Sequence, residues 1–282
     1  MKSWKLFPEN TQVAKYVECY WFLEKEHGDE SDNYPKLYPD PSAHLIIANI
    51  NDVYQYDQES VSQQGSGSYW IFPHRKTFVM DHSTSFIIIG VKFKIGALYA
   101  LNLHTLNSNT IQFELDKIVP VNIQSLLDIE SFNTENLFLQ GRNNGQGLCS
   151  TLDKIILPWL LTSQEDKQSE LVRNILPLLK DTPISQIGSV LHRSQRTVER
   201  NFLSVTALTL KQCHSMLRFE EMLEHLYKLE GEPINWANFS ATFGFSDQPH
   251  LIRHIKSFIG STPGEYIRQR DLTIDIYGNF EF

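Results

Sequence analysis

The sequence predicts an α+β chain of two domains: a β-rich barrel or sandwich, then an all-α domain with two helix-turn-helix motifs. Short apolar or alternating runs such as HLIIANI, YWIF and FIIIGVKFKI, separated by turn residues, are typical of strands. From NIQSLLDIESF onward the apolar spacing lengthens and becomes helical. A chain of 282 residues has room for two cores of ordinary size.

These patterns divide the chain into four expected segments. They are a β-rich domain over residues 1–125, a helical linker over 126–180, a domain with two helix-turn-helix motifs over 181–270, and a tail over 271–282. Pro158 and Pro177 should kink or end helices in the linker, because proline lacks the amide donor and clashes with the preceding turn. If the chain forms a homodimer, we expect the linker helices to mediate it.

The composition is that of a globular protein, with 41% hydrophobic and 21% charged residues. The N-terminal residues MKSWKLFPENTQVAKYVECYWFLEKE lack the apolar run and cleavage site of a signal peptide, so we expect a cytoplasmic protein without a membrane partner. Its three cysteines are widely spaced and fit a reduced compartment.

The charge is unevenly distributed along the chain. The net charge of −8 argues against a surface that binds nucleic acid or membranes everywhere. Residues 181–270, however, hold 10 Lys and Arg against 9 Asp and Glu, which leaves 15 against 24 for the rest. This is a modest basic footprint, weaker than that of a strongly basic DNA-binding domain.

One pattern occurs twice between residues 181 and 270. Its copies are TPISQIGSVLHRSQRTVERNFLSVTALTLKQC and PINWANFSATFGFSDQPHLIRHIKSFIGSTPGEY. With Ser194 aligned on Asp247, the matched pairs are Gln195 and Gln248, Val198 and Leu251, Arg200 and Arg253, and Phe202 and Ile255. The segment ALTLKQ then matches GSTPGE at unchanged spacing, so we interpret the two copies as a structural repeat.

Each copy predicts a helix, a tight turn and a second helix. Gly188 and Ser240 are small enough to let the two helices pack closely, and Gly244 can supply the left-handed residue that ends a helix. Ser194 and Asp247 are favourable N-caps for the second helix. The apolar residues of that helix are four apart and should face the core.

The polar face of each second helix is the predicted DNA-binding surface, since helix-turn-helix proteins insert this face into the major groove. Gln and Arg side chains can form bidentate bonds with adenine and guanine. A solvated face, or an internal salt bridge of Arg200 and Arg253, is the competing interpretation. The predicted contacts, with Lys256 assigned to a phosphate, are Gln195, Arg196, Thr197, Glu199, Arg200, Gln248, His250, Arg253 and Lys256.

A capping box starts the helix that follows each copy, at Thr209–Gln212 and at Thr262–Glu265. The helix that begins at Thr209 can run to about Leu229, which is roughly 30 Å. Successive major-groove faces on one side of a duplex are about 34 Å apart. One chain could therefore bind two adjacent groove segments.

These residues resemble the AraC/XylS family of bacterial transcription regulators. The segments GFSDQPHLIRHIKS, GSTPGEYI, SQRTVERNF and MLRFEEMLEHL carry the resemblance, and YVECYWFLE and YPDPSAHLII are similar to the sensor half of a subgroup. The resemblance implies a cupin-like effector domain followed by a double helix-turn-helix domain that binds double-stranded DNA. It also implies an activator, with RNA polymerase and a small-molecule effector as further partners.

The first motif departs from the family pattern at four positions, which hold Gly188, His192, Ala207 and Leu210. The family usually has Ala, then Gly at the turn, then Gly and Pro before the connecting helix. Histidine is among the residues that tolerate positive φ, so the turn can survive. These changes affect the rigidity of the first unit and its share of the DNA-binding specificity.

Aromatic residues of the first domain are candidates for an effector pocket, although buried core aromatics explain them as well. The candidates are Trp21, Tyr38, His44, Trp70 and Phe93. A metal site in the barrel needs two histidines one residue apart with a nearby Glu, a spacing that is absent around His44, His74, His82 and His104. We expect no metal and no cofactor.

Two other functions compete with DNA binding. A metal-dependent β-barrel enzyme lacks its ligand spacing here, and the sequence has no nucleophile elbow or phosphate loop. We therefore expect no enzymatic activity. The second alternative is a regulator that acts through protein contacts only, because its basic footprint is weak and its first motif is degenerate.

Overall fold

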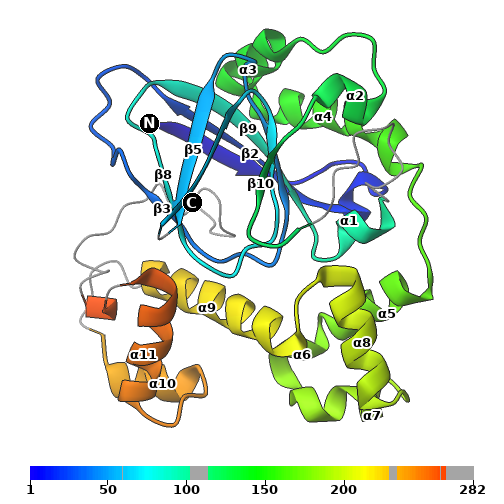
Figure 1. Cartoon of the computed structure of the whole chain (residues 1–282), viewed down its shortest axis with the longest axis vertical. Coiled ribbons are helices and arrows are strands. Elements are labelled where there is room, and N and C mark those ends of the chain that lie inside the picture. Colours follow the sequence, from blue (N-terminus) through cyan, green and yellow to red (C-terminus); the bar gives the residue numbers. More distant parts are fainter. Residues whose placement is uncertain (59, 102–113, 229–233, 261, 265–282) are drawn as a thin grey trace.

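The structure is a computed structural model and describes residues 1–58, 60–101, 114–228, 234–260 and 262–264 (Figure 1). Two antiparallel sheets form its N-terminal part, and its C-terminal part is helical. The predicted α+β fold class with two domains is therefore confirmed. The tail expected over residues 271–282 lies outside the described residues.

The larger sheet has six strands, and each pair of neighbouring strands in it is antiparallel. The order is β1 (Lys2–Leu6), β2 (Val17–Lys25), β9 (Phe86–Phe93), β4 (His44–Ile47), β7 (Tyr69–Ile71) and β10 (Ile118–Pro120). In the centre of this sheet, Gly90 lies opposite Trp21 on one side and Ile46 on the other.

The smaller sheet has four strands and packs against one face of the larger sheet. Its order is β3 (Lys36–Leu37), β8 (Phe78–Met80), β5 (Val53–Gln58) and β6 (Val61–Ser66). Side chains from both sheets form one apolar cluster, the inter-sheet core, which includes Trp21, Ile46, Tyr56, Phe78 and Ile88.

Strand β2 is buried on both faces, which explains its nearly continuous apolar sequence. Cys19 and Trp21 point into the inter-sheet core, whereas Tyr20 and Phe22 point to the opposite face. The pairing with β9 shifts register between Val17 and Cys19, as at a β-bulge.

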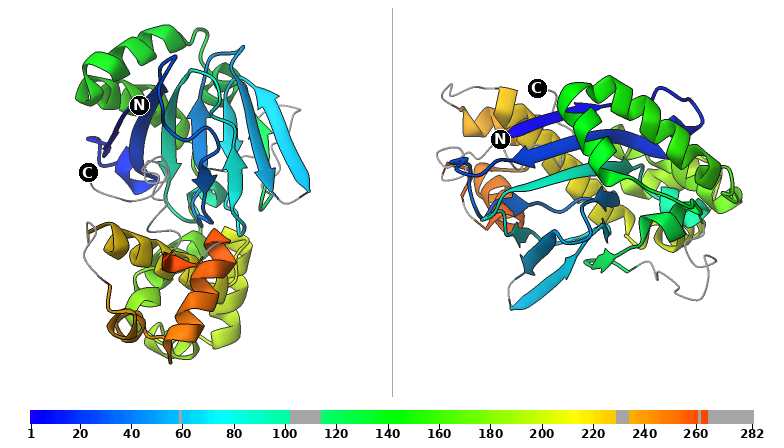
Figure 2. Two further views of the ribbon diagram at one scale, coloured as in Figure 1. Left: turned by 90° about the vertical axis from the view of Figure 1, so that its left-hand side faces the viewer. Right: turned by 90° about the horizontal axis from the view of Figure 1, so that it is seen from above.

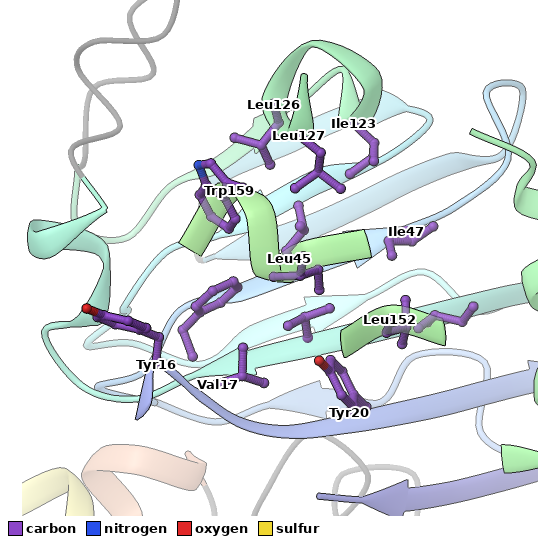
Figure 3. Packing of buried hydrophobic residues seen from close by; sticks show 14 of the residues in the cluster. Tyr16, Val17, Tyr20, Leu45, Ile47, Ile123, Leu126, Leu127, Leu152 and Trp159 are labelled. Atoms are coloured by element: carbon purple, nitrogen blue, oxygen red, sulfur yellow. The ribbon is translucent and has the colours of Figure 1, made fainter. Parts of the chain in front are cut away.

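Helices cover the outer face of the larger sheet, so the N-terminal domain has three layers (Figure 2). The covering helices are η1 (Val13–Lys15), α1 (Ala97–Ala100), α2 (Ile123–Leu127), α3 (Thr134–Asn143) and α4 (Gly145–Leu160). Figure 3 shows Leu126, Leu152 and Trp159 of these helices close to Leu45 and Tyr20 of the sheet. Pro158 lies inside α4.

The C-terminal helices form two small apolar cores. These helices are α5 (Lys167–Ile175), α6 (Leu178–Asp181), η3 (Ile184–Gln186), α7 (Ile187–Val190), α8 (Gln195–Thr206), α9 (Leu210–Lys228), α10 (Trp236–Thr242) and α11 (Gln248–Ile259). The first-unit core includes Val198 and Phe202, and the second-unit core includes Leu251 and Ile255. Pro177 separates α5 from α6, as expected of a helix-ending proline.

All three cysteines are reduced and buried, and each belongs to a different apolar cluster. Cys149 packs between α4 and the larger sheet, Cys19 in the inter-sheet core and Cys213 in the first-unit core. Burial raises the pKa of each of these thiols to about 12. In the folded protein they are therefore protonated and unreactive at neutral pH.

Candidate nucleic-acid interface

The first helix-turn-helix unit consists of α7, a turn and α8. Gly188 lies against the turn so closely that an added Cβ would be 2.9 Å from the Arg193 carbonyl oxygen and the Gln195 amide nitrogen. The Arg193 amide donates to the Gly188 carbonyl at 2.8 Å. His192 has φ 53, which confirms that histidine takes the left-handed turn position here. The predicted N-cap is also confirmed, because Ser194 Oγ accepts from the Thr197 amide at 3.1 Å.

The second unit consists of α10, a turn and α11. Ser240 is buried on α10, where its hydroxyl donates to the Trp236 carbonyl at 2.7 Å. Gly244 has φ 64, in the left-handed region that favours glycine. The Asp247 carboxylate accepts from the His250 amide at 2.7 Å and caps α11, as predicted.

The two units also end alike. Ala207 after α8 and Gly260 after α11 occupy matched positions of the repeat, and their φ values are 57 and 80. A left-handed alanine is uncommon, because its Cβ crowds the backbone. Its presence at this position indicates that the first unit follows the backbone path of the second although it has alanine where the second has glycine.

The capping box predicted at the start of the connecting helix is confirmed. Thr209 Oγ1 accepts from the Gln212 amide at 3.1 Å, and Gln212 Oε1 accepts from the Thr209 amide at 2.9 Å. Helix α9 then runs to Lys228, close to the predicted end. The second predicted box includes Glu265, which lies outside the described residues.

A family model described as a helix-turn-helix domain matches residues 187–269, which include both units. The chain carries an AraC-type DNA-binding domain. It is accordingly a DNA-binding transcription regulator. A second model, a domain of unknown function (DUF6597), matches residues 7–112.

Solved structures with low sequence identity resemble this AraC-type regulator. ToxT from Vibrio cholerae O395, bound to (E)-4-(8-methylnaphthalen-1-yl)but-3-enoic acid, has 9% identity and a TM-score of 0.47, with 95% of this chain and 99% of that chain covered. ToxT from strain SCE256 bound to an unsaturated fatty acid has 12% identity and a TM-score of 0.43, with 88% and 93% covered. The C-terminal domain of AraT from Geobacillus stearothermophilus has 19% identity and a TM-score of 0.33, with 37% and 89% covered. No curated protein sequence matches the chain.

Most of the predicted DNA contacts of the AraC-type domain are exposed. In α8 these are Arg196, Glu199 and Arg200, and in and around α11 they are Gln248, His250, Arg253 and Lys256. Within the part of the chain that the structure describes, neither Arg200 nor Arg253 forms an ion pair, so the internal salt bridge considered above does not occupy them.

Three predicted contacts in the first unit, Gln195, Thr197 and Glu199, also have internal partners. The half-buried Gln195 accepts from the Gly188 amide at 3.2 Å and donates to Glu199 at 2.9 Å. Thr197 bonds the Ser194 hydroxyl at 2.7 Å. These bonds hold the turn, whereas the matched Gln248 in the second unit is exposed. The second unit therefore presents the more open polar face.

Sequence reasoning missed one contact that supports α11. The Arg218 guanidinium of α9 stacks over the Phe245 ring at 3.7 Å and bonds the Phe243 carbonyl in the turn. Its presence in the family-like segment MLRFEEMLEHL was a signal, but its partner lies 27 residues away and no local pattern specifies it. The turn of the second unit is thus fixed from the connecting helix.

His254, on the half-buried side of α11, makes the second unit sensitive to acid. Burial, and to a smaller degree the positive charges of Arg218, His250 and His214, lower its pKa to about 4. Its Nε2 atom has no hydrogen-bonding partner among the described residues. Its ring packs against Phe258 with centroids 5.0 Å apart.

Because the unfolded chain takes up this proton near pH 6.5 and the folded chain only near 4, stability is complete above about pH 6.5 and falls toward pH 4. We expect a loss of about 2 kcal/mol across this window. In His254→Gln the loss of stability between pH 6.5 and 4 should be smaller by that amount. Urea unfolding of both proteins at several pH values measures this difference, and parallel wild-type and His254→Gln curves would contradict the assignment.

The structure does not bring the five predicted effector residues together around one hollow. Trp70 and Phe93 pack against each other at 5.4 Å on the helix-covered face of the sheet. Trp21 lies in the inter-sheet core and donates to His44 at 3.3 Å. Tyr38 belongs to the second-unit core, where it contacts Phe219.

Two of the histidines considered as metal ligands have hydrogen-bonding partners, and the ring of a third, His82, packs against Phe86 with centroids 4.3 Å apart. His44 bonds Asp40 at 3.0 Å, and His74 bonds the Phe72 and Tyr38 carbonyls at 3.2 and 2.7 Å. Among the described residues there is no group of three His, Cys, Asp or Glu that could hold a metal ion. His104 lies outside those residues. No helix in the described ranges is long and apolar enough to cross a membrane.

Proposed function

We propose that this AraC-type regulator binds a two-part operator with α8 and α11 in successive major grooves and activates transcription. The observation that carries the proposal is the repeat itself: two units with equivalent caps, turns and left-handed ends lie at the two ends of one helix (Figure 1). The 19 residues of α9 correspond to roughly 28 Å, close to the groove repeat of about 34 Å.

The exposed faces have the chemistry that this role needs. Arg196, Arg200, Arg253 and Lys256 extend from the two second helices without an acidic partner among the described residues. They can neutralise phosphates or bind guanine. Gln248 and His250 stand at the N-terminal end of α11, the end that helix-turn-helix proteins direct at base edges.

Arg253→Ala should weaken binding to a specific duplex by about 1–3 kcal/mol, if Arg253 binds a base, and should relax specificity at one position. Lys256→Ala should weaken binding to all sequences alike and reduce the salt slope by about 1. Gel-shift titration of the full chain over a salt series measures both, using a duplex that the protein selects from a random pool. Lys154→Ala, on the exposed side of α4, is the control and should bind as wild type.

Two outcomes would contradict this docking. If Arg253→Ala and Lys256→Ala bind like wild type, α11 does not enter the groove. If the wild-type chain selects no duplex and shows no salt-dependent binding, a regulator that acts through protein contacts only becomes the better explanation. A stoichiometric transition metal in the purified protein would revive the enzyme alternative.

Activation, RNA polymerase contact and homodimerisation through residues 126–180 remain predictions from the family resemblance and the linker helices. A reporter gene under the selected operator tests activation. If reporter expression falls in the presence of the regulator, the protein is a repressor at that operator and not an activator. Sedimentation of the purified chain tests the dimer. If the protein is a monomer at micromolar concentration, the dimer is not its resting state.

We further propose that a small hollow at one rim of the two sheets receives one polar group of the effector of the N-terminal domain. Its lining includes Tyr54, Tyr56, Tyr69, Met80 and Phe86, and its volume is about 40 Å³. The hydroxyls of Tyr56 and Tyr69 bond each other at 2.8 Å. The buried Tyr54 hydroxyl has no hydrogen-bonding partner among the described residues, so a polar atom of a ligand could satisfy it.

Tyr54→Phe should raise the free energy of unfolding by about 1 kcal/mol, because it removes a buried polar group that no partner compensates. Tyr56→Phe, which breaks the bond to Tyr69, is the matched control and should destabilise. Thermal unfolding with a panel of small apolar acids, alcohols and phenols tests the ligand. A compound that stabilises wild type and Tyr54→Phe equally would bind elsewhere.

A further inference from the structure

The N-terminal domain holds α11 at its C-terminal end. Lys36 Nζ, from β3, donates to the Ile259 carbonyl at 3.1 Å. The Thr77 hydroxyl, from the segment before β8, donates to the Phe258 carbonyl. These carbonyls belong to the last turn of α11, which has no further amides of its own to satisfy them.

The same domain holds α8 near its C-terminal end. Gly96, at the start of α1, is so close to α8 that an added Cβ would be 3.0 Å from Val205 Cγ1 and 3.7 Å from Thr206 Cγ2. Ile95 and Tyr99 beside it pack against the first-unit core. Both recognition helices are therefore supported at corresponding ends by one body.

Between these two supports, the N-terminal domain is joined to α9 by buried contacts. Lys92 Nζ of β9 lies 3.4 Å from Glu220 Oε1 of α9 and 3.2 Å from Asp40 Oδ2. The Tyr38 ring meets the Phe219 ring edge-on, with centroids 5.6 Å apart. Figures 1 and 2 show α9 running beneath one end of the sheet sandwich.

These contacts leave the DNA-binding faces open. The side chains of Arg196, Arg200, Gln248, His250 and Arg253 remain exposed although the domains are packed together. The interface therefore does not work by covering the polar faces. What it fixes is the orientation of α8 relative to α11.

We propose that the N-terminal domain is a brace that sets the separation and angle of the two recognition helices, and hence the half-site spacing that the regulator accepts. The proposal rests on the proposed function. A rigid pair of helices fits one spacing, because each added base pair rotates the second groove by about a tenth of a turn. A loosened pair can follow that rotation and loses the preference, while ordering its units costs entropy on every site.

The test measures affinity for the selected duplex and for versions with one or two base pairs added or removed between its half-sites. In wild type, a one-base-pair change should weaken binding by about tenfold. In the double variant Lys36→Met and Thr77→Val this penalty should shrink to about threefold or less. Glu220→Gln, which weakens the contact on α9 instead, should also reduce it. The two variants alter separate parts of the interface, and thermal melting confirms that each is folded.

Lys256→Ala is the control for affinity, because it should weaken binding to every spacer alike and keep the wild-type preference. A wild-type spacing preference in both brace variants would overturn the proposal. Tighter binding of both brace variants to the original duplex would also overturn the proposal, because the interface would then oppose DNA binding. If wild type selects no duplex at all, the proposed function fails before the brace is tested.

Discussion

Lys92→Met is expected to lower the free energy of unfolding by about 3–5 kcal/mol at pH 8. The Lys92 side chain is 1% exposed and its ammonium faces three carboxylates, Asp40, Glu220 and Glu18. Burial alone would lower the pKa of Lys92, but these carboxylates raise it well above its ordinary value. Methionine retains most of the aliphatic packing and removes the charge, which leaves the carboxylates buried without their cation.

The loss of stability caused by Lys92→Met should become smaller as the pH falls. In wild type, burial would raise the pKa of Asp40, but Lys92 and His44 hold it well below its usual range. Burial raises the pKa of Glu220. Without Lys92, the carboxyls of Asp40 and Glu220 should bind protons more tightly in the folded chain than in the unfolded one. The variant should therefore recover stability as pH falls toward about 4, while wild type does not, and the difference should narrow.

Urea unfolding of both proteins between pH 4 and 8 measures this effect. Lys154→Met, at an exposed position on α4, is the matched control and should change stability by less than about 0.5 kcal/mol at every pH. A cost below about 1 kcal/mol for Lys92→Met, or one that is independent of pH, would mean that water rather than Lys92 compensates these carboxylates.

Gly90→Ala is expected to destabilise the N-terminal domain by about 3 kcal/mol. Gly90 lies opposite Trp21 in the central strands, and the Trp21 ring lies across the position where a side chain would start. An added Cβ would be 1.8 Å from Trp21 Cε2 and 2.1 Å from Cζ2. The fully buried indole would have to move within a packed core.

Denaturant unfolding of Gly90→Ala, Trp21→Leu and the double variant separates this clash from a general weakening of the sheet. The smaller leucine should accept the methyl group, so the double variant should be more stable than the sum of the single effects predicts. Gly264→Ala is the control, since an added Cβ there meets nothing within 4 Å. Strict additivity would show that the cost of Gly90→Ala does not come from a clash with Trp21.

The C-terminal repeat could be predicted from the sequence because its signals are local. Ser194 and Asp247 cap helices that begin at the next residue, and Thr209 and Gln212 satisfy each other over three positions. Such interactions depend on short spacings and little on the rest of the fold.

The N-terminal domain was less predictable, because its contacts join distant segments. Lys92 and Glu220 are 128 residues apart, and neither has a neighbour in sequence that signals the other. Tyr38 was expected in an effector pocket, but it packs in the second-unit core against Phe219 of α9, a contact that no local sequence pattern signals. The hollow around Tyr54 was missed for the same reason.

The three buried cysteines give the chain a built-in set of reporters. Cys19, Cys149 and Cys213 are shielded in separate apolar clusters, and each becomes reactive only when its own cluster opens. The rates at which a thiol reagent labels them would therefore rank the local openings of the sandwich, its helical cover and the first DNA-binding unit. Such a ranking would reveal which part of the molecule loosens first without the introduction of any foreign probe.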